Sequence, residues 1–320
     1  MRSRISLRVE ILAAALVVVV AAVLFRYAWL PVFWEDHLAA MSTKWGLPVT
    51  GVGRWFSAWT LGDGQAFALI AADPLGLDEV SQLGHPAYRF MRAGFGWLAW
   101  LASLGRAELV PYGMAIVGAL AVAGTFMAAA RLRTRLGWPA WLIVLNPAVF
   151  IGFAGDTAEA LGVLFLALGM ATSGKWAPIA LGVTRPSYLV ALAGQFRKAM
   201  WGGAAALLLL LYGLSQFGFD FDQFGGRLGI PVVGYLADPD PMSGLVGLLA
   251  LGTLIVGVRH RDWSWIASGI FVLSFASDVV ADPINAWRAA GMLPVLWAFG
   301  PGYEVSAAAS TVGEPVPAPT

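Results

Sequence analysis

The stretch LVPYGMAIVGALAVAGTFMAAARLRTR, residues 109–135, decides the fold class of this chain. Residues 109–130 carry no charge, and a helix needs roughly 20 such residues to cross a hydrocarbon core of about 30 Å. Arginines follow at positions 131, 133 and 135, and Lys and Arg gather on the cytoplasmic side of membrane helices. The stretch therefore predicts a transmembrane helix whose C-terminal end faces the cytoplasm.

The composition of the whole chain indicates an integral membrane protein. Hydrophobic residues make up 59% of the 320 residues and charged residues 12%, about half of the roughly 25% usual in a soluble domain. Apolar runs of spanning length recur and leave no room for a separate soluble domain of ordinary size. The net charge of +1 indicates no class of partner, and the absence of Cys excludes disulfides, thiolate nucleophiles and cysteine metal sites.

The basic residues set the predicted topology. Arginines among the first eight residues precede the apolar run 11–24, and no small-residue cleavage site follows it, so this run predicts a retained anchor with the N-terminus in the cytoplasm. Residues 31–108 then form a large loop on the outer face. Within it, 93–104 is expected to lie along the membrane surface, because counting it as a crossing would place the arginines after residue 130 outside.

The segment 176–195 admits two interpretations. It is long enough for one crossing, but Thr184-Arg185-Pro186 interrupts it in the middle. A single crossing would export four basic residues further along the chain, whereas a re-entrant pair of short helices keeps them in the cytoplasm. These residues are Arg197, Lys198, Arg259 and Arg261. The charge pattern therefore predicts a hairpin with Arg185 at its tip on the outer side.

The predicted fold is all-α: a polytopic membrane protein with about eight transmembrane helices, the re-entrant hairpin and a large outer first loop with interfacial helices. Residues 1–305 form a single transmembrane domain, and residues 306–320, rich in Ala, Pro and small polar residues, form a disordered cytoplasmic tail. No convincing internal repeat is present, which weakens the case for a secondary transporter built from repeated halves. The remaining crossings are predicted at 138–154, 158–172, 199–217, 245–258, 263–279 and 284–299.

Charged residues of both signs gather on the predicted outer face, where they are suited to hold an anionic lipid phosphate against a base. They are Asp36, His37, Asp63, Asp73, His85, Arg89, Arg92, Asp156, Glu159, Arg185, Asp278, Asp282 and Arg288. The histidines lack the close spacing of metal ligands, so the residues themselves predict no metal site. No Walker loop, Gly-x-Ser-x-Gly elbow or basic-aromatic platform occurs, so neither a cytoplasmic nucleotide-using enzyme nor a nucleic-acid partner is expected.

Three of these carboxylates also have structural explanations. Asp63 lies between two glycines, and Asp-Gly is a common turn dipeptide. Asp156 and Glu159 have the spacing of a helix-capping box just before an apolar run. The same spacing places both near the predicted outer mouth of the bundle, so capping and substrate binding stay open for them.

The arginines carry a similar pair of interpretations. Arg185 lies within an apolar segment, where a cation costs about 2.5–3.5 kcal/mol and needs a partner, a cavity or a path to the headgroups. Arg89 and Arg92 are three residues apart. They either point to one phosphate or anchor a short helix at the headgroups.

Several short segments occur in order between residues 60 and 195: Gly62-Asp63-Gly64-Gln65, Ile70 to Pro74, Ala87-Tyr88-Arg89 with Arg92, Asn146-Pro147, Asp156 to Leu161, and Thr184-Arg185. Together they resemble a bacterial, mannosyltransferase-like branch of the GT-C superfamily, polytopic glycosyltransferases that take sugars from polyprenyl-phosphate carriers. The chain departs from the family pattern at Ala66 and Pro186, where relatives often have an aromatic and an acidic residue.

The resemblance implies an inverting transfer of a hexose, such as mannose, from a polyprenyl-phosphate carrier to an envelope glycan or lipid acceptor at the extracytoplasmic face of the bacterial inner membrane. Asp63 matches the aspartate that acts as general base or lies beside a divalent metal ion, the one cofactor that the resemblance leaves open. A transporter or flippase for a lipid-linked sugar and a non-catalytic scaffold of envelope assembly are the alternatives. Substrate binding is expected at Gln65, Arg89, Arg92, Asp156, Glu159 and Arg185.

Overall fold

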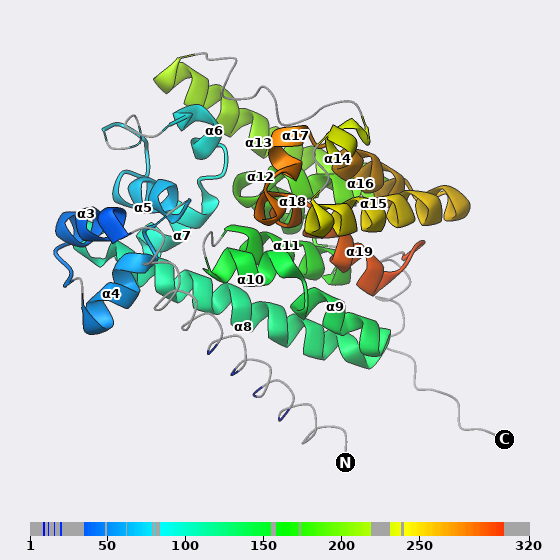
Figure 1. The fold of residues 1–320 in the computed structure, drawn as a ribbon, viewed down its shortest axis with the longest axis horizontal. Helices are drawn as coiled ribbons and strands as arrows, with labels where there is room; N and C mark the ends of the chain where they lie inside the picture. Colours follow the sequence, from blue (N-terminus) through cyan, green and yellow to red (C-terminus); the bar gives the residue numbers. More distant parts are fainter. Residues whose placement is uncertain are drawn as a thin grey trace.

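The structure, a computed structural model, describes residues 9, 12, 16, 20, 35–48, 50–61, 63–78, 80, 84–154, 158–172, 174–218, 231–237 and 240–303, apart from the side chains of residues 35–37 and 278. This part of the chain is helical and contains no strand, as Figure 1 shows. Asp156 and the predicted tail 306–320 lie outside the described residues. The predicted crossing 11–24 is described at single helical positions alone.

Three helical segments of the described part are long and apolar enough to cross a membrane. Large apolar side chains on them, among them Leu120, Leu208 and Leu248, are exposed on the protein surface, as expected where lipid replaces water. The other predicted crossings that the structure describes consist of shorter helices. The three segments are 107–136, 186–217 and 241–260, and they contain α8 (Val110–Leu136), α13 (Phe196–Phe217) and α15 (Pro241–His260).

The predicted outer loop 31–108 is itself largely helical and packs on the N-terminal end of α8. Its last α-helix, α7, buries Phe95 and Ala99 and exposes Leu101. Trp97 donates its indole N–H to the carbonyl of Pro74 at 2.9 Å, which joins α7 to the end of α5. The elements are α3 (Glu35–Trp45), α4 (Gly51–Ala58), α5 (Gly64–Ala72), α6 (Pro86–Phe90), α7 (Gly94–Ala102) and the 3-10 helix η3 (Ala107–Leu109).

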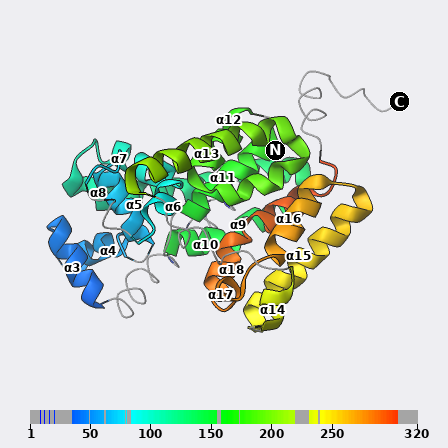
Figure 2. The same ribbon diagram turned by 90° about the horizontal axis from the view of Figure 1, so that it is seen from above.

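Shorter apolar helices complete the bundle. In Figure 2, α11, α12 and α13 lie together on one side, and α15 and α16 form a pair on the other. The elements are η4 (Trp138–Ala140), α9 (Trp141–Val144), α10 (Pro147–Ala154), α11 (Ala158–Thr172), α12 (Trp176–Thr184), η5 (Pro186–Gln195), α14 (Val233–Ala237), α16 (Trp263–Leu273), α17 (Ser277–Val280), α18 (Pro283–Ala289) and α19 (Met292–Phe299).

Asn146 and Pro147 explain the break between α9 and α10. Proline has no backbone N–H to donate and favours the first position of a helix. The Oδ1 atom of Asn146 accepts a hydrogen bond from the N–H of Ala148 at 3.0 Å. Its Nδ2 atom donates to the carbonyl of Gly291 at 2.6 Å. The buried Asn146 therefore ties the start of α10 to the turn between α18 and α19.

The chain reverses its direction at Arg185, between α12 and η5. Arg185 has φ −142° and ψ 75°, as expected because the residue before a proline avoids the α conformation. Pro178 and Leu189 both lie against Gly202 of α13, although they stand on opposite sides of Arg185 in the sequence. The predicted break at Thr184-Arg185-Pro186 is therefore present, and the two short helices run antiparallel.

The apolar segment 186–217 is not one straight helix, although its length and composition suggest a single span. Leu189 lies against Gly202, whereas a continuous straight helix would hold these two residues about 20 Å apart. The chain therefore folds back where η5 ends and α13 begins. The 22 residues of α13 are about 33 Å long and suffice for a crossing by themselves.

Gly202 is the close contact that holds α13 against the hairpin. A Cβ atom added at this position would overlap the carbonyl of Pro178, and one added at Gly182 would overlap the carbonyl of Gly202. Small residues allow membrane helices to approach to this distance. Gly203, the next residue, has open space around its Cβ position.

We expect Gly202→Ala to destabilise the protein by about 1–3 kcal/mol, because two backbones would have to move apart. Gly203→Ala is the matched control, and it should leave stability unchanged or raise it by up to about 1 kcal/mol through helix propensity. Thermal unfolding of both purified variants in the same detergent measures the difference. Equal melting temperatures for the two variants would show that the contact does not hold α13 in place.

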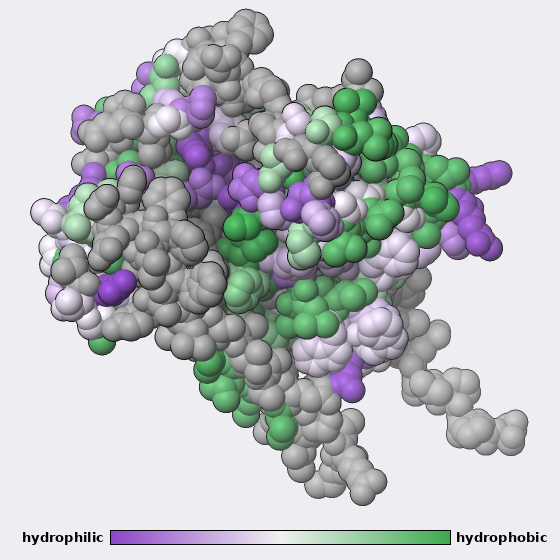
Figure 3. Space-filling view, in the orientation of Figure 1, coloured by the Kyte–Doolittle hydropathy of each residue, from purple (hydrophilic) through white to green (hydrophobic). Residues whose placement is uncertain are grey.

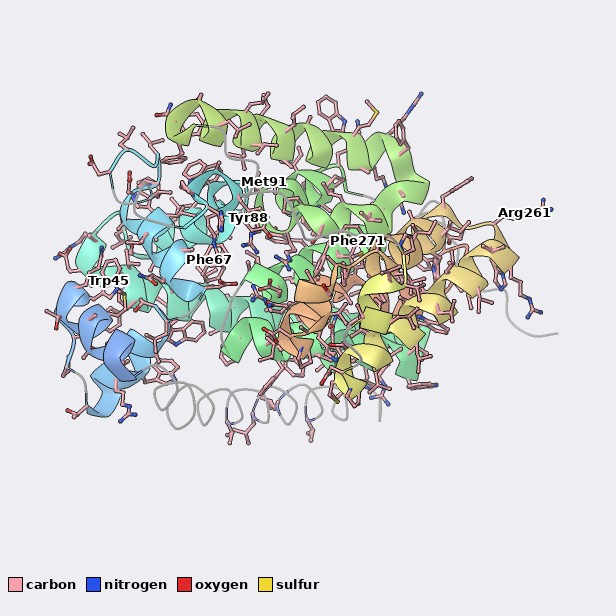
Figure 4. All side chains as sticks on the ribbon, turned by 45° about the horizontal axis from the view of Figure 1, so that its top comes forward. Trp45, Phe67, Tyr88, Met91, Arg261 and Phe271 are labelled. Atoms are coloured by element: carbon pink, nitrogen blue, oxygen red, sulfur yellow. The ribbon has the colours of Figure 1, made fainter. Side chains whose placement is uncertain are left out.

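The basic C-terminal end of α15 lies at one end of the long axis of the molecule. α15 ends in Arg259 and His260, and Figure 4 labels Arg261 at that extreme, far from Tyr88 and Met91. In Figure 3, hydrophilic residues gather at this end and again between α6 and α17, with a largely hydrophobic surface between the two groups.

Single cysteines at the two ends of α8 test which end faces outward, and the natural chain has no Cys to interfere. Leu104 before α8 and Trp138 after it are both well exposed and are separated by a helix about 40 Å long. A membrane-impermeant maleimide should label Leu104→Cys in intact cells and Trp138→Cys only after the membrane is opened. The opposite pattern would place the predicted outer loop in the cytoplasm.

Candidate functional site

Charged side chains from separate elements meet at one place in the bundle, which we call the arginine–carboxylate cluster. Asp63 precedes α5, Glu159 lies in the first turn of α11, and Arg185 lies at the reversal between α12 and η5. The remaining members come from α6, from the residues after it and from α18. The cluster consists of Asp63, Arg89, Arg92, Glu159, Arg185 and Arg288.

Asp63 is held by two guanidinium groups. Nη1 of Arg89 donates to its Oδ1 at 2.8 Å, and Nη2 of Arg288 donates to its Oδ2 at 2.5 Å. The Asp63 side chain is 24% exposed and makes no capping hydrogen bond to α5. The predicted turn therefore explains only the backbone position of Asp63. Its carboxylate pairs with arginines of the cluster.

Glu159 is the buried carboxylate of the cluster, with no exposed side-chain surface. Its Oε1 lies 3.1 Å from Nη2 of Arg185 and accepts a hydrogen bond from Nε of Arg288 at 3.2 Å. An ionised carboxylate at such a site is tolerated only when it is paired. Its Oε2 has no hydrogen-bond partner among the described residues. Glu159 thus binds arginines, and the residues that it would cap at the start of α11 lie outside the described part of the chain.

Arg288 joins the two carboxylates. Its guanidinium reaches Asp63 with Nη2 and Glu159 with Nε, and its Nη1 donates to Oδ1 of Asn285 at 3.2 Å. Asn285 in turn donates to Asp282, whose other oxygen caps α18 at the N–H of Ile284. Arg288 is therefore held by the two carboxylates on one side and by Asn285 on the other.

The sequence placed Arg288 on the outer face but did not assign it to the site. It is separated from Asp63 by 225 residues, so no local motif connects the two. The sequence Asp282-Pro283 indicates the start of a helix. Asn285 and Arg288 are three residues apart in it, which places an amide and a cation on one face. This pattern could have indicated that Arg288 belongs to a polar site.

Arg92 is buried, and its guanidinium makes no hydrogen bond or ion pair with a described residue. The residue is 4% exposed, its guanidinium lies 4.7 Å from the ring centroid of Tyr88, and its Nε has no hydrogen-bond partner in the described part of the chain. A buried guanidinium in this state is costly unless an anion approaches it. Arg92 lies close enough to act on the charge of Glu159, so such an anion would bind within the cluster.

The cluster has more positive than negative charge. Among the described residues it contains four arginines and two carboxylates. Nε of Arg185, like that of Arg92, has no hydrogen-bond partner among the residues that the structure describes. Guanidinium groups offer paired donors that match a phosphate. The arrangement therefore suits a phosphorylated ligand.

Two further residues, Gln65 and Asp156, were predicted to bind the substrate. Gln65 is half-buried in the first turn of α5, next to Asp63, and its side chain makes no hydrogen bond to a described residue. Asp156 lies outside the described residues. The structure therefore brings together Asp63, Arg89, Arg92, Glu159 and Arg185 as predicted, and leaves Gln65 at the edge of the cluster.

A divalent metal ion does not suit this cluster. Both oxygens of Asp63 accept hydrogen bonds from guanidinium groups, and a further cation would face the same arginines. Such ions prefer several carboxylate and carbonyl oxygens. The described residues contain no group of three or more His, Asp or Glu side chains close enough to hold a metal. The chemistry proposed below therefore uses the charged side chains alone.

Comparison of the chain with protein-family models, with curated proteins and with solved structures gives no match. The function is therefore argued from the cluster and from the sequence pattern.

We expect Arg288→Gln to lower stability by about 3 kcal/mol, because two carboxylates would lose their shared cation in a largely buried site. Arg106→Gln is the matched control. Arg106 pairs with Glu108 at 2.6 Å, but both side chains are more than half exposed, so its loss should matter little. Thermal unfolding in one detergent compares the variants. Similar melting temperatures would mean that Arg288 is not needed to hold the carboxylates.

Proposed function

We propose that this protein is a membrane glycosyltransferase of the GT-C type. It would move a hexose from a polyprenyl-phosphate carrier to an envelope glycan or lipid acceptor at the extracytoplasmic face of a bacterial inner membrane. The proposal includes about eight crossings, with the α12–η5 hairpin entering from the outer side. It is supported most by one observation: Asp63 pairs with Arg89 and Arg288, and Arg288 also pairs with Glu159, which binds the buried Arg185.

The arginines would bind the phosphate of the donor. In an inverting transfer, an oxygen of the acceptor attacks the anomeric carbon as the bond from that carbon to the phosphate oxygen breaks. The electron pair of this bond leaves with the lipid phosphate, which gains negative charge. Fixed cationic groups stabilise such a charge most strongly where water is excluded. Arg92 and Arg185, the most buried arginines of the cluster, would do so.

Asp63 would act as the general base. The acceptor hydroxyl loses its proton as its oxygen attacks, and a carboxylate within hydrogen-bond distance takes that proton. Of the two carboxylates, Asp63 is the partly exposed one and Glu159 the buried one. An acceptor that arrives from the surface would reach Asp63 first.

A passage for a lipid-linked sugar is the second candidate. The pair of Glu159 and Arg185 lies deep among the helices, and ionisable groups at such positions mark transport pathways as well as reaction centres. A reconstituted protein that moves the lipid-linked sugar across a vesicle membrane without transferring the sugar would favour this candidate. A scaffold without either activity would tolerate substitutions of both Asp63 and Arg185.

Asp63→Asn should lower the rate of sugar transfer by about 10²- to 10⁴-fold, the usual contribution of a positioned base. The assay uses purified protein, polyprenyl-phosphate hexoses as donors and envelope lipid extract as acceptor. Glu108→Gln is the control, because it removes one negative charge from an exposed ion pair outside the cluster, and it should transfer at the unchanged rate. Transfer by Asp63→Asn at the rate of the unsubstituted protein would remove Asp63 from the mechanism.

A further inference from the structure

The two oxygens that a base would use are occupied in this structure. Oδ1 of Asp63 accepts from Arg89 at 2.8 Å and Oδ2 accepts from Arg288 at 2.5 Å. Charge-assisted hydrogen bonds of this kind are about twice as strong as neutral ones. Each oxygen keeps a second lone pair, but the two guanidinium groups stabilise the ionised form of the carboxylate and so oppose its protonation. Proton transfer to Asp63 is therefore easier once at least one arginine has changed its partner.

The two carboxylates of the cluster differ in how readily they can change partner. Glu159 has no exposed side-chain surface and is bound by Arg185 and Arg288, which are themselves 9% and 12% exposed. Asp63 and Arg89 are 24% and 23% exposed. Leaving a carboxylate unpaired is far more costly in the buried position than at the partly solvated one. Glu159 is thus the fixed carboxylate, and Asp63 is the exchangeable one.

Arg288 does not need Asp63 in order to keep its position. Its Nε stays bonded to Glu159 and its Nη1 to Asn285, while the Tyr188 hydroxyl donates to its backbone carbonyl at 2.8 Å. Nη2 is the atom that Asp63 occupies. An anion that replaces Asp63 at this atom would find the guanidinium already in place.

We propose that Asp63 is an internal counter-charge that the phosphate of the ligand displaces from Arg89 and Arg288. The phosphate binds beside Arg92, whose guanidinium makes no hydrogen bond or ion pair with a described residue, and takes over the donors of Arg89 and Arg288. Asp63 then loses these two hydrogen bonds, and its carboxylate can accept the proton of the acceptor hydroxyl. The base thus becomes available only when the donor is bound. The last step, proton transfer to Asp63, rests on the proposed function. The displacement of Asp63 by the phosphate requires only that the cluster binds an anion.

The exchange predicts that removing the charge of Asp63 strengthens binding of a lipid phosphate. The probe is polyprenyl monophosphate, which has no sugar to transfer, presented in nanodiscs with the full-length protein. Asp63→Asn should bind it about tenfold more tightly than the unsubstituted protein, because the phosphate no longer competes with a charge-assisted hydrogen bond. Glu108→Gln removes the same charge from an exposed pair and should bind with unchanged affinity.

A second variant distinguishes displacement from simple repulsion between two negative charges. Repulsion would give the same gain from Asp63→Asn whether or not Arg89 is present. Displacement requires the shared arginine, so the gain should shrink to threefold or less in an Arg89→Gln background, since contacting residues couple in such cycles. Asp63→Ser replaces Asp63→Asn if the latter fails to fold, because it removes the same charge.

The outcomes separate this inference from the proposed function. Equal or weaker binding by Asp63→Asn overturns the exchange, and a gain that is independent of Arg89 overturns displacement in favour of repulsion. Binding of the probe by neither protein overturns the anion site altogether. If the gain appears as expected but the unsubstituted protein transfers no sugar, the exchange stands and the transferase proposal fails.

Discussion

The guanidinium of Arg288 is the group on which the arrangement of the other elements depends. It lies between Asp63 before α5 and Glu159 of α11, and it comes from α18. Charges inside an apolar bundle must be paired, because an unpaired buried charge costs several kcal/mol. Three regions that are far apart in the sequence therefore have to meet at one point. Around it, the Tyr188 hydroxyl and the Asn146 amide donate to the carbonyls of Arg288 and Gly291, so the site also joins the two halves of the chain.

The features that the sequence predicted correctly arise from local physical causes. Apolar runs predicted helices, and α11 begins and ends at the predicted residues, 158 and 172. Thr184-Arg185-Pro186 predicted the interruption at Arg185, since a residue before proline avoids the helical conformation, and the positions of the basic residues predicted that the chain reverses there. The number of full crossings was harder to predict, because mean apolarity does not show where a helix is interrupted. Asn146 and Pro147 divide one predicted crossing into two short helices, and three helical segments of the described part have spanning length and composition.

Arg288, the member of the site that the sequence did not predict, is far from the other members in the sequence. Asp63, Arg89 and Arg185 belong to recognisable segments, and their expected convergence is present. Arg288 lies in a short helix that resembles no motif, and its role follows from contacts that form only after the chain has folded. Which carboxylate is buried was equally invisible, because Asp63 and Glu159 both stand at helix starts in the sequence. Their exposure differs because Glu159 lies on α11, which packs against α8, α10, α12 and α19.

The excess of arginines is difficult to explain by stability alone. Replacing buried ion pairs by well-packed apolar side chains is often neutral or stabilising, so a bundle selected only for stability would have no need for Arg92 with an aromatic ring as its partner. The anionic ligand proposed above would account for that residue. The hydrogen bonds that fix Arg288 and Asn146 to their neighbours also bear on the kind of function. A transport pathway that opens alternately to both sides would have to break some of them in every cycle, whereas a reaction centre would use them to keep its cations in place. With Glu159 and Arg288 fixed and Asp63 exchangeable, the cluster is better suited to hold one phosphate in a single orientation than to pass it on.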